Sequence, residues 1–230
     1  MAVPVARPTV VVTIDGPAGA GKSTVARRLA DLLGFDYLDT GAMYRAVALI
    51  GHRDGLLHDA EALARRLESL ELVISGGVVL VNGDDVTAQL RDPEVTRFSS
   101  VVAAQPAVRA FLVRAQRQAA FGRRIICEGR DQGTVVFPDA LCKFFLTADP
   151  RERARRRSED MARQGKAVPD LEALEREISE RDMRDANRAE SPMVAAADAD
   201  HVDTTSLLLE DVLALLSGRI QKALSGGLEI

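Results

Sequence analysis

The segment IDGPAGAGKST at residues 14–24 has residue types and a spacing that can hold phosphate groups. Gly16 is followed, after four residues, by Gly21-Lys22-Ser23, the spacing of a P-loop, whose backbone N–H groups turn inward around phosphate oxygens. In such a loop Lys22 supplies charge to the β- and γ-phosphates, and Ser23 supplies a hydroxyl to Mg²⁺. The pattern predicts an ATP site, with Mg²⁺ carried by the ATP, made of Gly16, Pro17, Ala18, Gly19, Ala20, Gly21, Lys22, Ser23 and Thr24.

A P-loop functions only where a strand enters it and a helix leaves it. Residues 9–14, TVVVTI, form a β-branched run typical of a buried parallel strand. Val25, Leu29, Leu32 and Leu33 recur at helical spacing up to Gly34, a typical residue just after a helix end. The N-terminus of that helix would point at the loop and favour an anion there, which disfavours the alternative of a chance match in an ordinary turn.

Arginine is concentrated between residues 151 and 157, directly after a predicted strand. If this segment is helical, Arg153, Arg156 and Arg157 fall on one face, which suits a mobile lid that brings guanidinium groups onto phosphates. The alternative is a solvated helix face.

A second arginine set lies in the stretch ERDMRDANR at residues 180–188. Arg181, Asp185 and Arg188 are spaced as one helical stripe in which a carboxylate separates two guanidinium groups. Taken alone, the stripe is equally explained by a ladder of intrahelical ion pairs worth a few tenths of a kcal/mol each.

The composition is that of a globular protein without a membrane segment. Of the 230 residues, 47% are hydrophobic and 28% are charged, and no apolar stretch approaches the roughly 20 residues that span a bilayer. The N-terminal sequence MAVPVARPT lacks the apolar core and cleavage pattern of a signal peptide. We therefore expect a cytoplasmic protein with no membrane partner.

The cysteines, the histidines and the net charge limit the other classes of function. Cys127 and Cys142 lie in apolar, strand-like runs, so we expect small buried side chains rather than a disulfide or a metal site. His52, His58 and His201 show no ligand spacing. The net charge of −4, the absence of Trp and the presence of only two Tyr disfavour a nucleic-acid partner.

The remaining chain alternates helical and strand-like segments, which predicts an α/β fold. Helical patterns cover residues 40–50, 59–70, 106–122, 150–163, a segment ending before 192, and the C-terminal region. Strand patterns cover 35–39, 124–128, 141–146 and 201–203. Residues 71–86 differ, because two β-rich runs joined by Ser75-Gly76-Gly77 predict an antiparallel hairpin within an inserted subdomain. The glycine-bearing loop at 129–134 is expected to face the same crevice as the P-loop.

Several motifs in one order resemble bacterial cytidylate kinase (CMP kinase), within the nucleoside monophosphate kinases. These motifs are IDGPAGAGKST, LDTGAMYRAVAL, EGRDQGTVVFPDA, KFFLTAD, ERDMRDANRAESPM and AADADHVDTT. The Asn-Lys-x-Asp pattern of GTPases is absent. The resemblance implies an α/β P-loop three-layer fold with a parallel five-stranded sheet, an inserted NMP-binding subdomain and a short lid. In this single P-loop kinase domain the core would be 8–58 and 104–230, the insertion about 59–103, and the lid about 153–170.

The resemblance also implies a role for individual residues. The catalytic residues would be Lys22, Arg153, Arg157, Arg181 and Arg188. The CMP phosphate would bind near Arg45, Arg130 and Arg188, with Arg181 and the lid residues Arg153 and Arg157 at the bridging phosphates. Cytosine and ribose would meet Thr40, Ser100, Arg109, Glu128 and Asp185, and Asp131 joins the substrate-binding set. A dianionic phosphate suits guanidinium forks, whereas an amine and hydroxyls suit carboxylate and hydroxyl acceptors.

Six positions carry further expectations. Glu128 stands where the family pattern has Asp, and Thr40 where it often has Ser, so both keep the functional group. Asp15 and Asp131 flank the phosphate loops, where an acid either holds Mg²⁺ through water or caps a turn. Tyr44 and Phe137 are expected to pack rather than to contact a base.

The predicted reaction is transfer of the γ-phosphoryl group of ATP to CMP or dCMP by a protein expected to be a monomer. The alternatives are a kinase for UMP or for a non-nucleotide such as shikimate, and a nucleotide-gated binding protein that transfers no phosphate. Nucleic-acid binding is a weaker third alternative, which depends only on the arginine clusters.

Overall fold

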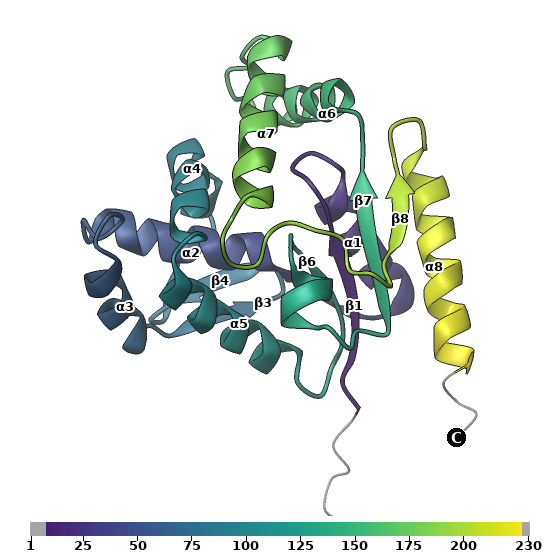
Figure 1. The fold of residues 1–230 in the computed structure, drawn as a ribbon, viewed down its shortest axis with the longest axis horizontal. Coiled ribbons are helices and arrows are strands. Elements are labelled where there is room, and N and C mark those ends of the chain that lie inside the picture. The colour runs from purple at the N-terminus through teal and green to yellow at the C-terminus, as the bar shows by residue number, and fades with distance from the viewer. Residues whose placement is uncertain (1–7, 227–230) are drawn as a thin grey trace, which may run out of the picture.

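A parallel sheet of five strands forms the centre of the computed structural model, which describes residues 8–226 (Figure 1). Residues 1–7 lie outside the described residues. They include most of the N-terminal segment for which the sequence predicts no signal peptide. The strand order is β2-β6-β1-β7-β8, and all neighbours are parallel, as expected. The strands are β1 (Val10–Asp15), β2 (Asp36–Asp39), β6 (Arg124–Glu128), β7 (Cys142–Thr147) and β8 (Asp200–Asp203).

Helices cover both faces of this sheet. Successive residues of each strand point to opposite faces, so both faces carry apolar side chains that the helices bury. On one face, Val12 packs into a core with α1 (Lys22–Leu33) and α8 (Leu209–Gly226). On the other face, Val11 packs into a core with α2 (Thr40–Arg53), α3 (Ala60–Glu68), α4 (Pro93–Val102) and α5 (Pro106–Ala120). Cys127 is fully buried in this second core, as predicted, whereas Cys142 is only half-buried, and both cysteines are free thiols.

The predicted hairpin is part of a small antiparallel sheet beside α2. It consists of β3 (Leu72–Ser75), β4 (Val78–Val81) and β5 (Asp84–Asp85). Gly76 and Gly77 form the first turn, with φ of 57° and 82°, and Asn82 and Gly83 form the second, with φ of 51° and 87°. Val79 and Val81 are buried in the core of α2 to α5, so the small sheet is fastened to the main body. A 3₁₀ turn at Gln89–Arg91 leads into α4.

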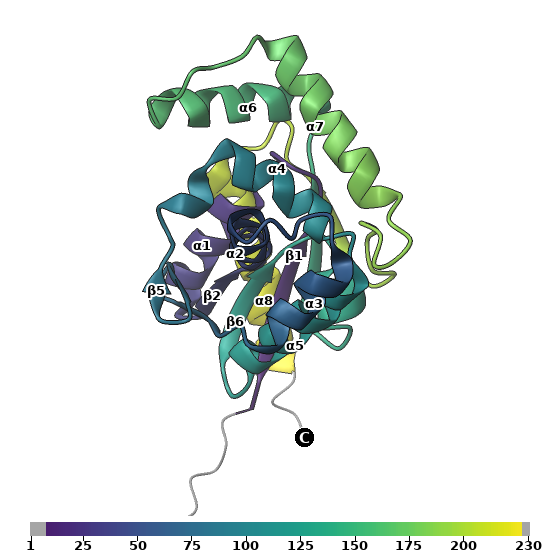
Figure 2. The ribbon, with the colours of Figure 1, turned by 90° about the vertical axis from the view of Figure 1, so that its left-hand side faces the viewer.

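Two helices form an arm over the carboxyl edge of the main sheet (Figures 1 and 2). They are α6 (Pro150–Arg163) and α7 (Leu171–Ala186), and we call them together the helical arm. Each begins at an aspartate whose side chain accepts backbone N–H groups of the first turn, Asp149 for α6 and Asp170 for α7. The arm has a small core of its own, to which Ala154, Leu174 and Ile178 contribute.

The loop expected after β6 is instead partly a π-helical turn at Gln132–Val136. The turn begins where the Asp15 carboxylate accepts the N–H groups of Gln132 and Gly133, at 2.9 and 2.8 Å. Asp15 therefore caps a turn, the second of its two expected roles. Burial raises the pKa of Asp15 to about 6, against the lowering effect of these two N–H groups.

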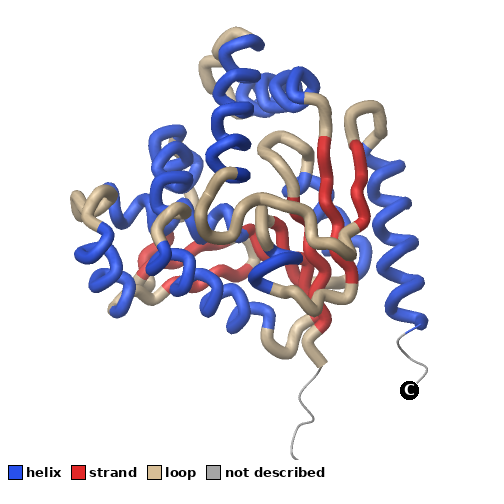
Figure 3. Tube along the Cα trace, in the orientation of Figure 1, coloured by secondary structure: helices blue, strands red, loops and turns tan. Residues whose placement is uncertain are grey.

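The two edges of the sheet have different environments. The P-loop and the loop after β8 lie at the carboxyl edge, below the helical arm (Figure 3). The start of β1 and the C-terminal end of α8 lie at the opposite edge (Figure 1). Between residues 8 and 226, no helix is long and apolar enough to cross a membrane.

Candidate active site

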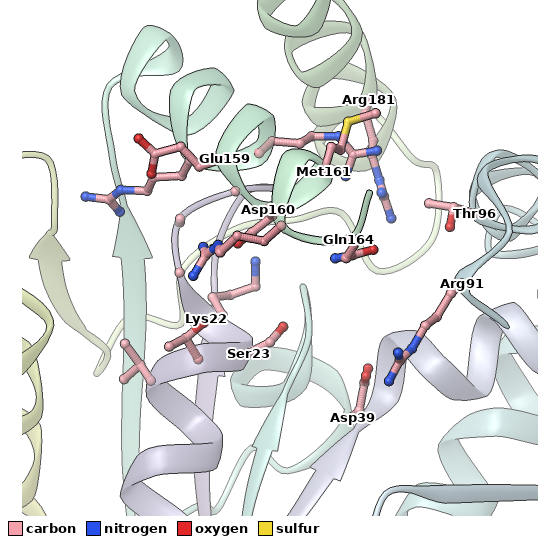
Figure 4. A pocket seen from close by; sticks show the side chains of 18 of the residues that line it. Lys22, Ser23, Asp39, Arg91, Thr96, Glu159, Asp160, Met161, Gln164 and Arg181 are labelled. Atoms are coloured by element: carbon pink, nitrogen blue, oxygen red, sulfur yellow. The ribbon is translucent and has the colours of Figure 1, made fainter. Parts of the chain in front are cut away.

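A cavity of about 1650 Å³ lies between the P-loop, α4 and the helical arm (Figure 4). Residues 19–24 form its floor at the N-terminus of α1. Ser100 lines it from α4, and Arg157 and Arg181 line it from the arm. Arg45 of α2 also lines it, so the structure brings the P-loop and part of the predicted acceptor site to one space.

The shape of the P-loop depends on its glycines. Gly16, Gly19 and Gly21 have φ of 137°, 77° and 87°, values at which a side chain is strained. A Cβ atom on Gly16 would lie 2.0 Å from the carbonyl oxygen of Leu146 in β7, so there the neighbouring strand also excludes a side chain. The helix α1 begins at Lys22, and its free N–H groups therefore face the loop.

Lys22 is buried at the floor of the cavity and, within residues 8–226, pairs with no carboxylate. Its Nζ donates to the Pro17 carbonyl oxygen at 2.6 Å, and the side chain is nearly inaccessible. Burial, reinforced by the positive Arg130, lowers the pKa of Lys22 to about 7. A phosphate at this point would supply the negative charge that the lysine lacks.

Glu128 ends β6 directly beside the P-loop. Its Oε2 accepts the Ser23 hydroxyl at 2.8 Å, its Oε1 accepts the Tyr37 hydroxyl, and its backbone oxygen accepts Thr40 Oγ1 at 2.6 Å. Burial, reinforced by Asp39, raises the pKa of Glu128. The resemblance assigned Glu128 to the acceptor sugar, whereas the structure places its carboxylate on the P-loop serine. The buried Glu128 carboxylate and the exposed Ser23 hydroxyl beside it fit Mg²⁺, which needs few protein ligands when phosphates supply others.

Two arginines of the arm line the cavity, and each also has a buried donor. Within the described residues, the buried Nε atoms of Arg157 and Arg181 have no hydrogen-bond partner. Burial lowers the pKa of Arg181 to about 10, and the nearby Arg130 adds to this. Because leaving such donors unpaired is costly, these two side chains fit an anion in the cavity.

A network of charges lies next to the cavity, on the side of the predicted acceptor residues. Arg109 pairs with Asp131, both buried, and Arg130 Nε lies 3.1 Å from Asp185 Oδ2. Arg188 donates to the backbone oxygens of Asp185 and Ser191, at 3.3 and 3.0 Å. The structure thus brings the predicted acceptor residues Arg109, Arg130, Asp131, Asp185 and Arg188 together.

Two further predicted arginines, Arg45 and Arg153, are held by other groups of the protein. Arg45 pairs with Asp39 at 3.1 Å at the start of α2. Arg153, expected to face the phosphates with Arg156 and Arg157, is turned away from them and buried against the P-loop backbone. Its Nε donates to Ala148 and its Nη1 to Ala18, at 3.0 and 2.9 Å, because α6 presents this face to the loop rather than to the cavity.

Sequence reasoning missed Tyr37 and Asp182. Tyr37 lies two residues before Asp39 in β2, so both side chains point to the same face of the sheet. This spacing was the signal that could have identified Tyr37. Asp182 accepts the N–H of Ala18 at 3.0 Å, 164 positions away, and nothing local in the sequence indicates that contact. The expected packing of Tyr44 and Phe137 is confirmed, since both lie against the core of α2 to α5.

Comparison with known proteins gives one consistent result. The family model described as cytidylate kinase matches residues 12–222. A cytidylate kinase of Pelotomaculum thermopropionicum is 49% identical over 215 residues, covering 91% of this chain and 95% of that protein. One of Caldanaerobacter subterraneus subsp. tengcongensis is 46% identical, covering 95% and 97%. A bifunctional pantoate ligase/cytidylate kinase of Synechococcus sp. is 50% identical over 90% of this chain, which spans only 43% of that protein. The chain therefore belongs to the cytidylate kinase family.

Proposed function

We propose that the protein is a phosphotransferase that uses ATP to convert CMP and dCMP into CDP and dCDP by direct in-line transfer, supplying pyrimidine nucleotides in the cytoplasm. The observation that carries this proposal is the convergence of Lys22, Arg157 and Arg181 on one cavity above the P-loop. Within residues 8–226, neither Lys22 nor Arg181 pairs with a carboxylate, and Arg157 has only a loose partner, Glu177, at 3.5 Å. Three such cations suit a transition state whose charge is spread over phosphoryl oxygens. The cytidylate kinase relatives favour CMP as the acceptor.

The donor side follows from the P-loop. Residues 16–24 would hold the ATP phosphates, with Lys22 at the β- and γ-phosphates. Ser23 and Glu128 would hold Mg²⁺, which would neutralise phosphate charge during transfer. The cavity continues past Thr204 to Leu208 and Val212, where an apolar rim suits the base of ATP.

The acceptor side uses the charge network. Arg45, Arg130 and Arg188 would bind the CMP phosphate, while Thr40, Ser100, Arg109, Asp131 and Asp185 would surround cytosine and ribose. The acceptor phosphate is already an anion, so no general base is required. Catalysis would come from alignment of donor and acceptor and from charge stabilisation.

Exclusion of water would come from the insertion at about 59–103 and from a lid at about 153–170. Lys166, in the turn of the helical arm, donates to the carbonyl oxygen of Arg91 at 2.9 Å, so the arm already touches the segment before α4. Such a contact at the mouth would limit transfer of the phosphoryl group to water. We also propose that the protein acts as a monomer.

The test is ADP release with MgATP and one acceptor at a time, using CMP, dCMP, UMP, AMP, GMP and shikimate at equal concentrations. Fast release with CMP and dCMP alone is the expected result. Preference for another acceptor would retain a kinase but reject the assigned pocket. Absence of release with every acceptor would reject phosphoryl transfer and leave nucleotide-gated binding.

A further inference from the structure

The helical arm holds one residue of the P-loop by both of its backbone groups. The Ala18 N–H donates to Asp182 Oδ1 on α7 at 3.0 Å, and the Ala18 carbonyl oxygen accepts from Arg153 Nη1 on α6 at 2.9 Å. Arg153 and Asp182 also form an ion pair with each other. We call these two side chains the Ala18 clamp.

The clamp is shielded from water, so its hydrogen bonds count for more than surface contacts. The side chains of Arg153 and Asp182 are 7% and 15% exposed. Arg153 is fixed in turn by its Nε, which donates to the Ala148 carbonyl oxygen at the end of β7 at 3.0 Å. Hydrogen bonds of this kind, with a charged partner in a dry setting, are stronger than neutral ones.

Packing joins the same pieces. The methyl group of Ala18 belongs to the small core that α6 and α7 make with Ala154, Leu174 and Ile178. Next to it, a Cβ atom on Gly19 would lie 3.0 Å from the Cβ of Arg153, so α6 is in direct contact with the loop. The P-loop is therefore shaped by the helical arm as much as by its own glycines.

We infer that Asp182 is a positioning residue for ATP, which ties the P-loop to the helical arm together with Arg153. This inference rests on the proposed use of the P-loop for ATP. The Ala18 N–H donates to Asp182 and is therefore not available to a phosphate. The clamp instead fixes the position of Ala18, which precedes residues 19–24 at the floor of the cavity. The position of the arm then sets the geometry of the ATP site.

The clamp makes a specific prediction about the two substrates. Removal of Asp182 frees the Ala18 N–H and leaves Arg153 without its carboxylate, so the loop loses its fixed shape and ATP binds more weakly. The predicted acceptor residues Arg130 and Asp185 pair with each other and not with the clamp. The affinity for CMP is therefore expected to stay the same.

The experiment is calorimetric titration of the full chain with MgATP and, separately, with CMP. Asp182→Ala is expected to raise the Kd for ATP about tenfold, the order expected for a hydrogen bond to a charged group. Asp182→Asn keeps an oxygen acceptor for the Ala18 N–H and is expected to recover most of that loss. Glu172→Ala is the matched control, because Glu172 is an exposed acid on the same helix, 3.9 Å from Arg176.

A second measurement reports on the clamp itself. Hydrogen exchange at the Ala18 amide is expected to be slow in the wild type and in Asp182→Asn, and fast in Asp182→Ala. Unchanged ATP affinity in Asp182→Ala, or equal loss of ATP and CMP binding, would overturn the inference. If Asp182→Ala does not fold, Arg153→Lys replaces it, and ATP affinity equal to wild type in that variant would equally overturn it.

These readouts need no phosphoryl transfer. ATP affinity and Ala18 exchange decide the role of Asp182 even if the acceptor assay rejects CMP, so failure of the inference and failure of the proposed function are distinguishable.

Discussion

Buried charges surround the cavity, and their partners determine which of them are available to phosphates. Arg109 has its carboxylate in Asp131, whereas Lys22 has only a backbone oxygen and Arg181 an unpaired Nε. A paired charge mainly holds structure, and an unpaired one lowers its burial cost by binding an anion. The charges therefore divide into paired ones, which hold the acceptor side in shape, and unpaired ones, which remain available to phosphates.

Arg109 tests the paired charges. In Arg109→Leu, the buried Asp131 carboxylate loses its partner, so the free energy of unfolding is expected to fall by about 3 kcal/mol. Urea denaturation at pH 7 measures this change. Arg114→Leu, at an exposed position of the same helix, is the control and should change stability by less than about 0.5 kcal/mol. Equal stability of the two variants would show that the pair adds nothing.

Lys22 tests the unpaired charges through pH. Its pKa of about 7 in the free protein means that ATP binding above pH 7 must take up a proton, because phosphate favours the charged amine. The affinity for ATP is expected to fall about tenfold per pH unit above that value. The phosphates themselves stay fully ionised there, since their second pKa is near 6.

Lys22→Arg is the control for that prediction, because an arginine stays charged across the range. Titration with MgATP between pH 7 and pH 9 should give a flat profile for the arginine variant. A flat profile for the wild type would mean that Lys22 is charged in the free protein.

Among the elements, the helical arm is the one most separate from the sheet. Its core consists of few side chains, and it is tied to the body by a small number of polar contacts. These are the Ala18 clamp, the Arg130–Asp185 pair, the Lys166 contact and Arg156. Arg156 donates to the hydroxyl and backbone oxygen of Thr204, after β8, at 3.0 and 2.6 Å. The arm should therefore open locally at a lower free energy than the sheet.

Leu174→Ala tests this separation. Loss of a side chain that is 1% exposed in the arm core is expected to destabilise the arm by about 2–5 kcal/mol. Hydrogen exchange should become faster in α6 and α7 while β1 and β6 stay protected. Leu216→Ala, fully buried between α8 and the sheet, is the matched control and should lower protection in the sheet core. Equal acceleration in the sheet by Leu174→Ala would contradict an independent arm.

The elements also differ in how well they could be predicted from the sequence. The P-loop, α1, α6 and α7 were predictable because their glycines, caps and periodicity act within a few residues. The π-helical turn was not, because its capping carboxylate, Asp15, lies 117 positions from Gln132. The same reason explains Glu128, whose partner Tyr37 is 91 positions away. The resemblance grouped residues that lie close together in the structure, while packing decided which way Arg153 and Glu128 face.

At the scale of the whole molecule, three separate parts enclose the cavity: the P-loop edge, the segment around α4, and the helical arm. The contact from Lys166 to the Arg91 carbonyl oxygen joins the last two. This contact therefore narrows the route by which substrates enter the cavity and products leave it.

Lys166→Ala tests the joining contact. Loss of one exposed hydrogen bond, worth about 1 kcal/mol, is expected to raise KM for both substrates by about threefold to fivefold, because the enclosed form becomes less populated. Steady-state kinetics measure this change. Lys222→Ala, at an exposed position of α8, should leave both KM values unchanged. Identical kinetics of the two variants would show that the contact does not contribute to enclosure.

The two edges of the sheet have a practical consequence for handling the molecule. The start of β1 and the end of α8 lie at the edge opposite the P-loop (Figure 1). A tether to a surface, or a fluorescent protein joined at either of these points, would face away from the mouth of the cavity. Immobilised and single-molecule assays could therefore hold the enzyme by its ends and still leave the route of the nucleotides open.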